Sequence, residues 1–218
     1  MLLEPLILYF VLFFPGTFSP WGAEPLPAGI PFSVLGELSR TLTYTAPSLA
    51  LLWYLVLKNS GTASLAGEKP GKNDVYSFII GFPALVAIGL ILSFLISFFP
   101  APSPLPKIEA PASVPGWIVM ALSCIGTGYL EESYFRCYLL KKMTKITFAW
   151  TGVMIRIVFS TALFAVCHLY EGPWGIANAV LAGAVLAALF ERYGALHGIA
   201  WAHGAYNAFV YVMGVWGD

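Results

Sequence analysis

Six polar side chains with catalytic potential stand in stretches of sequence that are otherwise apolar. They are Glu131, Glu132, Arg136, His168, His203 and Asn207. An ionisable group in membrane hydrocarbon costs at least about 2.5–3.5 kcal/mol, so a chain that keeps such groups is expected to use them. A carboxylate with imidazoles can activate water, and an imidazole with an amide can stabilise an oxyanion. The set therefore indicates hydrolytic chemistry.

The two adjacent glutamates are expected to play different parts. On a helix, Glu132 and Arg136 are four residues apart and share a face, so they can form an ion pair. Glu131 points about 100° away and has no such partner on its own helix. The sequence therefore predicts one neutralised carboxylate and one available carboxylate.

The two histidines and the asparagine come from other apolar segments. Phe164 and His168 lie four residues apart, as do His203 and Asn207. Because lipid offers no hydrogen-bond partners, polar groups on separate membrane helices are expected to converge inside a bundle. Each feature has a structural alternative, since an ion pair can be a staple, a histidine can pack, and an asparagine can join two helices. Their conjunction favours one internal polar cluster.

Composition places these groups in a membrane. The chain has 218 residues, of which 59% are hydrophobic and 10% charged, whereas a soluble domain has roughly 25% charged residues. This composition excludes a soluble enzyme and predicts that membrane lipids surround the protein. Eleven basic and 11 acidic residues give no net charge, so nucleic-acid binding has no support. The three cysteines lie in apolar stretches, which argues against a disulfide framework.

Apolar runs long enough to cross a bilayer predict the helices, since about 20 residues span its core. The predicted spans cover residues 2–18, 41–57, 75–99, 117–140, 148–169, 173–190 and 193–216. We expect an all-α, polytopic membrane helix bundle of about seven (six to eight) transmembrane helices. Residues 1–115 would form N-terminal membrane helices and connecting loops, and residues 116–218 a catalytic core. The proline-rich segment 100–115 predicts an extended connector.

The positive residues predict the orientation of the bundle. With a cytoplasmic N-terminus and seven spans, seven basic residues between the spans face the cytoplasm and only Lys107 faces outward. The seven are Lys58, Lys69, Lys72, Lys141, Lys142, Lys145 and Arg192. Of the remaining basic residues, Arg156 is expected to meet lipid phosphate or cap a helix, and Arg40 has no assigned partner. His197, at the start of a predicted helix, is expected to be interfacial.

The polar residues also form three short motifs, in order along successive predicted helices. Residues 131–136 resemble an EExxxR motif, residues 164–168 an FxxxH motif, and residues 203–207 an HxxxN motif. In this order they resemble the CAAX protease and bacteriocin-processing family, which comprises the type II CAAX prenyl endopeptidases. The resemblance covers about residues 116–209.

The resemblance implies an intramembrane endopeptidase with a helical core of about eight spans. Carried over by position, Glu131 is the base that activates water, assisted by His168, while His203 and Asn207 hold the oxyanion. Glu132 and Arg136 support them. The substrate would be a polypeptide with a membrane-associated or lipid-modified tail, and the protein would be a multi-pass protein of a bacterial or archaeal cell membrane.

Two further alternatives stay open. Glu131, His168 and His203 could offer one oxygen and two nitrogens to zinc with an open position for water, but the absence of an HExxH helix leads us to favour a mechanism without a metal or other cofactor. A non-catalytic membrane partner, such as a bacteriocin-immunity or scaffolding protein, could use the same cluster to bind a peptide. A proton-coupled transporter ranks last because no internal repeat is visible.

Overall fold

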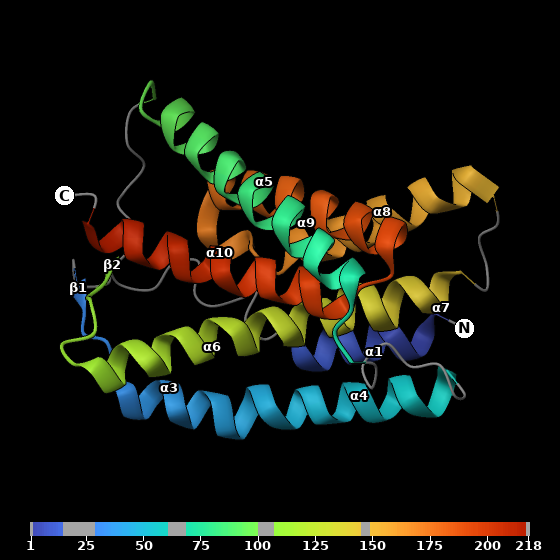
Figure 1. The fold of residues 1–218 in the computed structure, drawn as a ribbon, viewed down its shortest axis with the longest axis horizontal. Helices are drawn as coiled ribbons and strands as arrows, with labels where there is room; N and C mark the ends of the chain where they lie inside the picture. Colours follow the sequence, from blue (N-terminus) through green and yellow to red (C-terminus); the bar gives the residue numbers. More distant parts are fainter. Residues whose placement is uncertain (1, 15–28, 61–68, 100–106, 145–148, 217–218) are drawn as a thin grey trace.

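The computed structural model describes residues 2–14, 29–60, 69–99, 107–144 and 149–216. Within these residues the protein is a bundle of helices (Figure 1). The helical elements are α1 (Leu3–Leu12), α3 (Val34–Arg40), the π-helix η1 (Thr41–Thr45), α4 (Ala46–Ser60), α5 (Lys72–Ile96), α6 (Val114–Glu132), the π-helix η3 (Ser133–Leu140), α7 (Lys141–Met143), α8 (Ala149–Val166), the 3-10 helix η4 (Leu169–Glu171), α9 (Gly172–Tyr193) and α10 (Leu196–Trp216). Two-residue strands, β1 (Gly29–Ile30) and β2 (Lys107–Ile108), pair in parallel.

Several of these elements join end to end into longer rods. The first π-helix joins α3 to α4, and the second joins α6 to α7, so the described residues form seven helical rods. The all-α class is therefore confirmed, and each rod overlaps a predicted span. Residues 72–96 and 169–193 are long and apolar enough to cross a membrane. The number of seven spans stays a prediction, as does the division at residue 115. Residues 15–18 of the first predicted span and residues 100–106 of the connector lie outside the described residues.

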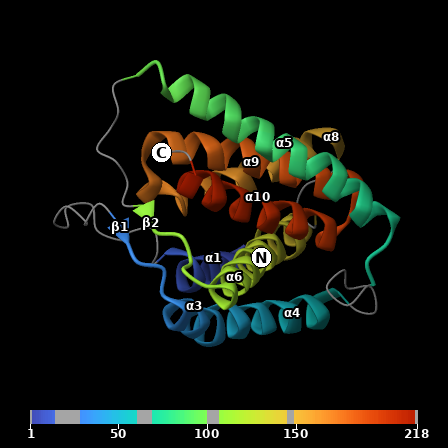
Figure 2. The ribbon, with the colours of Figure 1, turned by 60° about the vertical axis from the view of Figure 1, so that its left-hand side comes forward.

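Helices α6 and α10 form the centre of the bundle. In Figure 2 they lie between α5 on one side and the α3 and α4 rod on the other. Glycines let their backbones approach closely: a Cβ added at Gly128 would lie 2.7 Å from the carbonyl oxygen of Ala200. A Cβ added at Gly204 would lie 2.7 Å from the Cα of Ile125. Small residues at a crossing allow this contact between membrane helices.

Tyrosine hydroxyls fix α1 against this centre. Tyr134 donates to the carbonyl oxygen of Pro5 at 2.7 Å, and Tyr9 donates to that of Leu163 at 3.0 Å. A buried tyrosine usually finds such a partner, because its ring is apolar and its hydroxyl is not. Helix α1 is therefore joined to both η3 and α8.

Six of the seven basic residues predicted to face the cytoplasm lie in or beside elements at one end of the bundle, and the seventh, Lys145, lies outside the described residues. The ends of α4, α7 and α9 and the start of α5 lie toward the same side of the molecule (Figure 1). At this end Lys142 forms an ion pair with Glu4 at 2.9 Å, which ties the start of α1 to α7. The alternating course of the rods supports the predicted arrangement, whereas the direction in which it sits in a membrane stays a prediction.

Two arginines have partners that the sequence did not indicate. Arg156 forms a two-pronged ion pair with Glu191, with nitrogen to oxygen distances of 2.7 and 2.8 Å. The sequence did not predict this partner, a carboxylate on α9 that offers two oxygens to the guanidinium, and the expected lipid or cap contact of Arg156 stays a prediction. Arg40 pairs with Glu37 at 2.9 Å. It also hydrogen-bonds to Ser123, which joins α3 to α6.

Candidate active site

The two glutamates stand where α6 changes its winding. Ser113 caps the N-terminus of α6 by accepting a hydrogen bond from the Gly116 amide at 3.2 Å. The helix is regular as far as Glu132, and the π-helix η3 then begins at Ser133. Wider turns of this kind occur frequently at functional sites.

Glu132 lies between two positive or polarisable partners. Its Oε2 is 3.1 Å from the Nε of Arg136, and both side chains are fully buried. Its Oε1 is 2.8 Å from the Nδ1 of His203. Side chains on a helix lean toward its N-terminus, and α6 and α10 are antiparallel. Glu132 and His203 therefore lean toward each other across the helix crossing.

Glu131 is the more open of the two carboxylates. Its side chain is 17% exposed, and its Oε2 is 3.5 Å from the Nε2 of His203. The imidazole thus faces Glu132 with one nitrogen and Glu131 with the other. The predicted ion pair of Glu132 and Arg136 is present, but Glu132 also anchors His203, which the spacing along one helix did not indicate.

The cluster balances its charges when the imidazole is protonated. Two carboxylates face one guanidinium and one imidazole. Both nitrogens of His203 can donate a proton only in the imidazolium form. A buried charge without a partner is costly, so four groups of matched charge are the favourable arrangement. In that form His203 is a hydrogen-bond donor rather than a base.

Arg136 is held by three further groups. Its Nη2 donates to the carbonyl oxygen of Gly183 on α9 at 3.1 Å. Its guanidinium carbon lies 4.9 Å from the ring centre of Phe164 and 5.6 Å from that of Phe135. Such cation–π contacts strengthen when water is excluded. Arg136 therefore fixes the position of Glu132 from the side opposite to His203.

Phe164 connects the two catalytic histidines of the predicted site. Its ring centre is 4.6 Å from that of His168 and 5.8 Å from that of His203. The Nδ1 of His168 is 2.8 Å from the carbonyl oxygen of Phe164. Because a carbonyl only accepts, Nδ1 carries the proton and a neutral ring leaves Nε2 free to accept one. The sequence placed Phe164 on the same stripe as His168 but did not indicate this packing role.

Two of the predicted residues are not joined to the cluster by direct bonds. Among the described residues, no hydrogen bond or ion pair links His168 to Glu131 or His203. Asn207 lies one turn beyond His203 on α10 and is half-buried. Within the part of the chain that the structure describes, its side chain makes no hydrogen bond to the cluster. The structure therefore brings together Glu131, Glu132, Arg136 and His203, with the other two residues adjacent.

The residues of the zinc alternative do not fit a metal site in this arrangement. No three His, Cys, Asp or Glu side chains gather as a metal-binding group within the described residues, to which Glu131, His168 and His203 belong. The Nδ1 of His203 is engaged by Glu132, and that of His168 by its own helix. Each imidazole would have only its Nε2 to offer a metal, and the described side chains do not bring these two nitrogens together with Glu131.

Other polar residues near the cluster have structural partners. Ser160 donates to the carbonyl oxygen of Phe135 at 3.0 Å. The Nδ1 of His197 lies 3.0 Å from the hydroxyl of Tyr129. His197 is half-buried at the packing of α6 against α10. These contacts support a role in packing for both residues.

The fold and the site define an all-helical protein in which two of the described helices are long and apolar enough to cross a membrane and in which carboxylate, imidazole and guanidinium groups form a buried cluster. Residues 113–209 match the family model described as "Rce1-like: Type II CAAX prenyl endopeptidase Rce1-like". The match confirms the resemblance seen in the three motifs, and the matched segment contains all six predicted site residues. The comparisons with curated proteins and with solved structures gave no match.

Proposed function

We propose that the protein is an intramembrane endopeptidase that hydrolyses a peptide bond of a membrane-associated polypeptide with water activated by Glu131. The match of residues 113–209 to the family model supports a CAAX-protease type of peptide hydrolase. The observation that carries the proposal further is the position of Glu131, the partly exposed carboxylate beside a His203 that Glu132 holds in place. A carboxylate that a water molecule can reach is able to accept a proton from that water as a general base.

The proposed reaction begins with water near Glu131. Glu131 accepts a proton from the water as the water oxygen bonds to the scissile carbonyl carbon, whose own oxygen becomes an oxyanion. The resulting carboxylic acid gives the proton to the amide nitrogen as the C–N bond breaks. His168 assists by accepting a hydrogen bond from the same water at Nε2, the nitrogen that its helix leaves free.

His203 and Asn207 are proposed to hold the oxyanion. The Nε2 of His203 is 3.5 Å from Glu131, whereas its Nδ1 is 2.8 Å from Glu132. The N–H at Nε2 is therefore the more weakly bonded of the two and the one available to the oxyanion. A donor already aimed at a developing oxyanion lowers the activation barrier by about 2.7–4 kcal/mol. Glu132 and Arg136 act through His203 and are therefore positioning residues.

The proposed surroundings follow from the apolar helices around the site. The protein is proposed to be a multi-pass protein of a bacterial or archaeal cell membrane, with membrane lipids as its surroundings. Its substrate is proposed to be a polypeptide whose tail is membrane-associated or lipid-modified, because a site enclosed by membrane helices is reached most directly by a chain that already lies in the bilayer.

The proposed reaction needs no metal ion, which a chelator can test. We expect the protein reconstituted in vesicles to keep its rate of cleavage after treatment with EDTA or 1,10-phenanthroline, because Glu131 supplies the base and His203 the positive charge. Loss of activity that zinc restores would contradict this mechanism and favour a zinc ion held by Glu131, His168 and His203.

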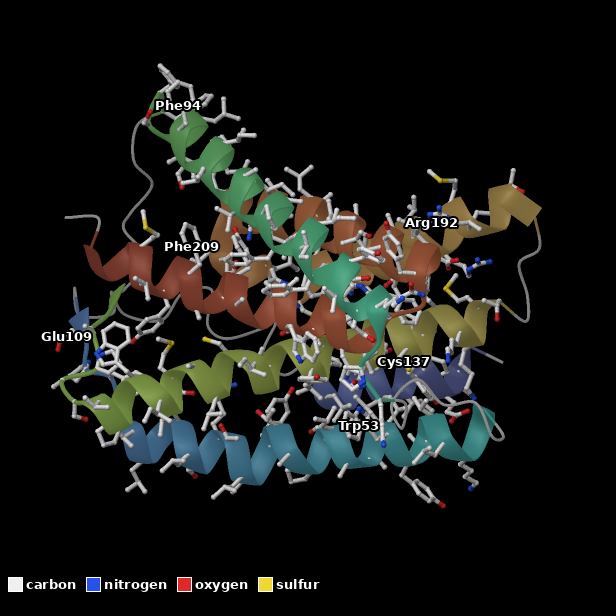
Figure 3. The ribbon with its side chains drawn as sticks, in the orientation of Figure 1. Trp53, Phe94, Glu109, Cys137, Arg192 and Phe209 are labelled. Atoms are coloured by element: carbon white, nitrogen blue, oxygen red, sulfur yellow. The ribbon has the colours of Figure 1, made fainter. Side chains whose placement is uncertain are left out.

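The function itself is tested by comparing the C-termini of membrane proteins. Mass spectrometry of cells that carry the intact protein and of cells that carry Glu131→Ala should find one or more polypeptides that are shortened only in the former. Glu109→Gln is the control, since Glu109 is exposed and lies at one end of the molecule, away from Cys137 in η3 (Figure 3). Identical sets of C-termini in all three strains would refute the proposed function.

A further inference from the structure

Helix α10, which carries His203, begins without a side-chain cap of its own. It follows α9 after a two-residue turn, in which Gly194 has a left-handed φ of +64°. The first amides of any helix lack partners within the helix and need acceptors from elsewhere. The residue before α10 is Ala195, whose methyl group accepts no hydrogen bond.

An aspartate from a different helix supplies that acceptor. Asp74 lies in the first turn of α5 and is 7% exposed. Its Oδ1 accepts a hydrogen bond from the Gly198 amide of α10 at 2.9 Å, and its Oδ2 accepts one from the Gly71 amide at 2.8 Å. One carboxylate thus caps two helices, and its negative charge meets the positive end of each.

The backbones meet closely at this contact. A Cβ added at Gly198 would lie 2.1 Å from the carbonyl oxygen of Asp74, so only glycine permits the approach. Farther along, a Cβ added at Gly81 of α5 would lie 3.1 Å from the Cβ of Ala202. The contact between α5 and α10 therefore extends from the first turn of α10 to the residue before His203.

The residue before Asp74 holds the other side of the same turn. The side-chain amide of Asn73 donates to the carbonyl oxygen of Tyr193 at 3.0 Å. Tyr193 is the last residue of α9, where carbonyl oxygens lack helical partners. The start of α5 lies beside the start of α10 in both ribbon views, and Arg192 marks the nearby end of α9 (Figure 3).

We propose that Asn73 and Asp74, which we call the α5 clamp, are positioning residues that set the height and rotation of α10 and thereby hold His203 between the two glutamates. Both residues lie outside the segment that matches the family, 113–209. Through the α5 clamp, residues of the N-terminal half of the chain help to position the candidate active site. The inference rests on the proposed function for its kinetic readout, but it also has a readout of its own.

The test separates positioning of α10 from simple capping of its end. Asp74→Ala removes the shared acceptor, whereas Ala195→Ser gives α10 an N-cap within its own chain segment. In vesicles, Asp74→Ala should lower kcat by about 100-fold, the effect of misplacing a catalytic group by about 1 Å. In the variant that carries both changes, the thermal midpoint should return toward that of the intact protein while kcat stays low. Ala195→Ser alone is the matched control and should keep both values.

The second readout is the modification of His203 by diethyl pyrocarbonate, located by mass spectrometry with His168 as the internal reference, because His168 follows α8 and does not lie on α10. Modification requires an unprotonated ring nitrogen, and both nitrogens of His203 face carboxylate oxygens. The variant with both changes should therefore show faster modification of His203 than the intact protein. Unchanged modification, or a kcat that Ala195→Ser restores together with stability, would overturn the clamp. If the intact protein cleaves nothing, the proposed function fails and the modification rate alone decides the clamp.

Discussion

Replacing Glu131 with Gln is expected to lower the rate of peptide cleavage by about 10²–10⁴-fold, the usual contribution of a general base. Glutamine has the same size, but its amide cannot accept the proton that water must lose. The 17% exposure of the Glu131 side chain and the 3.5 Å length of its contact with His203 predict that the variant folds and accumulates. The measurement is the rate of cleavage in vesicles at equal protein amounts, with Glu109→Gln as the control.

The outcome also separates an enzyme from a non-catalytic partner. Cleavage at the normal rate by Glu131→Gln would show that another group is the base. A cellular phenotype that survives the substitution, with no cleavage by either form, would favour the bacteriocin-immunity or scaffolding alternative. A variant that fails to accumulate is replaced by Glu131→Asp, which keeps the charge and withdraws the carboxylate from the ring of His203.

Replacing Arg136 with Met is expected to cause a large loss of stability, about 3–5 kcal/mol, the usual cost of leaving a buried charge uncompensated, because only the imidazolium of His203 then faces Glu131 and Glu132. Both members of the ion pair with Glu132 are fully buried, so no water compensates the carboxylate that remains. The free energy of unfolding in detergent micelles is the measurement. The matched control is Arg156→Met, whose ion pair with Glu191 is partly exposed, at 8% and 17%, and whose loss should be smaller.

A second substitution distinguishes lost charge balance from lost packing. In the Arg136→Met protein two carboxylates face the single imidazolium of His203. Changing Glu132 to Gln there removes the excess negative charge and should recover most of the stability, since a buried ion pair is often replaceable by neutral groups. Cleavage should not recover, because His203 loses the carboxylate that holds its Nδ1. An Arg136→Met protein as stable as the intact one would contradict the structural role of the pair.

Local patterns in the sequence predicted the helices and part of the site. Apolar runs located each rod, and the spacing of Glu132 and Arg136 predicted their ion pair, because residues four apart on a helix are neighbours whatever the rest of the fold does. The predicted convergence of three helices is seen for Glu131 and His203, which come from α6 and α10.

Contacts between helices far apart in the sequence were not predictable in this way. The bond between Glu132 and His203 depends on the height at which α10 crosses α6. The ion pair of Arg156 with Glu191 depends on α8 and α9 lying side by side. Asp74 gave a local signal as an acid in the first turn of a helix, but nothing in the sequence identified Gly198 as its second partner. His168 lies just beyond the last turn of α8, where periodicity no longer fixes its direction.

The close crossing of α6 and α10 limits how a polypeptide can enter. At Gly128 and Gly204 the two backbones nearly touch, so there is no layer of side chains between them that could slide or part. The pair is expected to move as a single rigid body that keeps carboxylates and imidazole in register. We therefore expect a polypeptide substrate to enter by displacing the outer helices, while α6 and α10 keep their positions relative to each other.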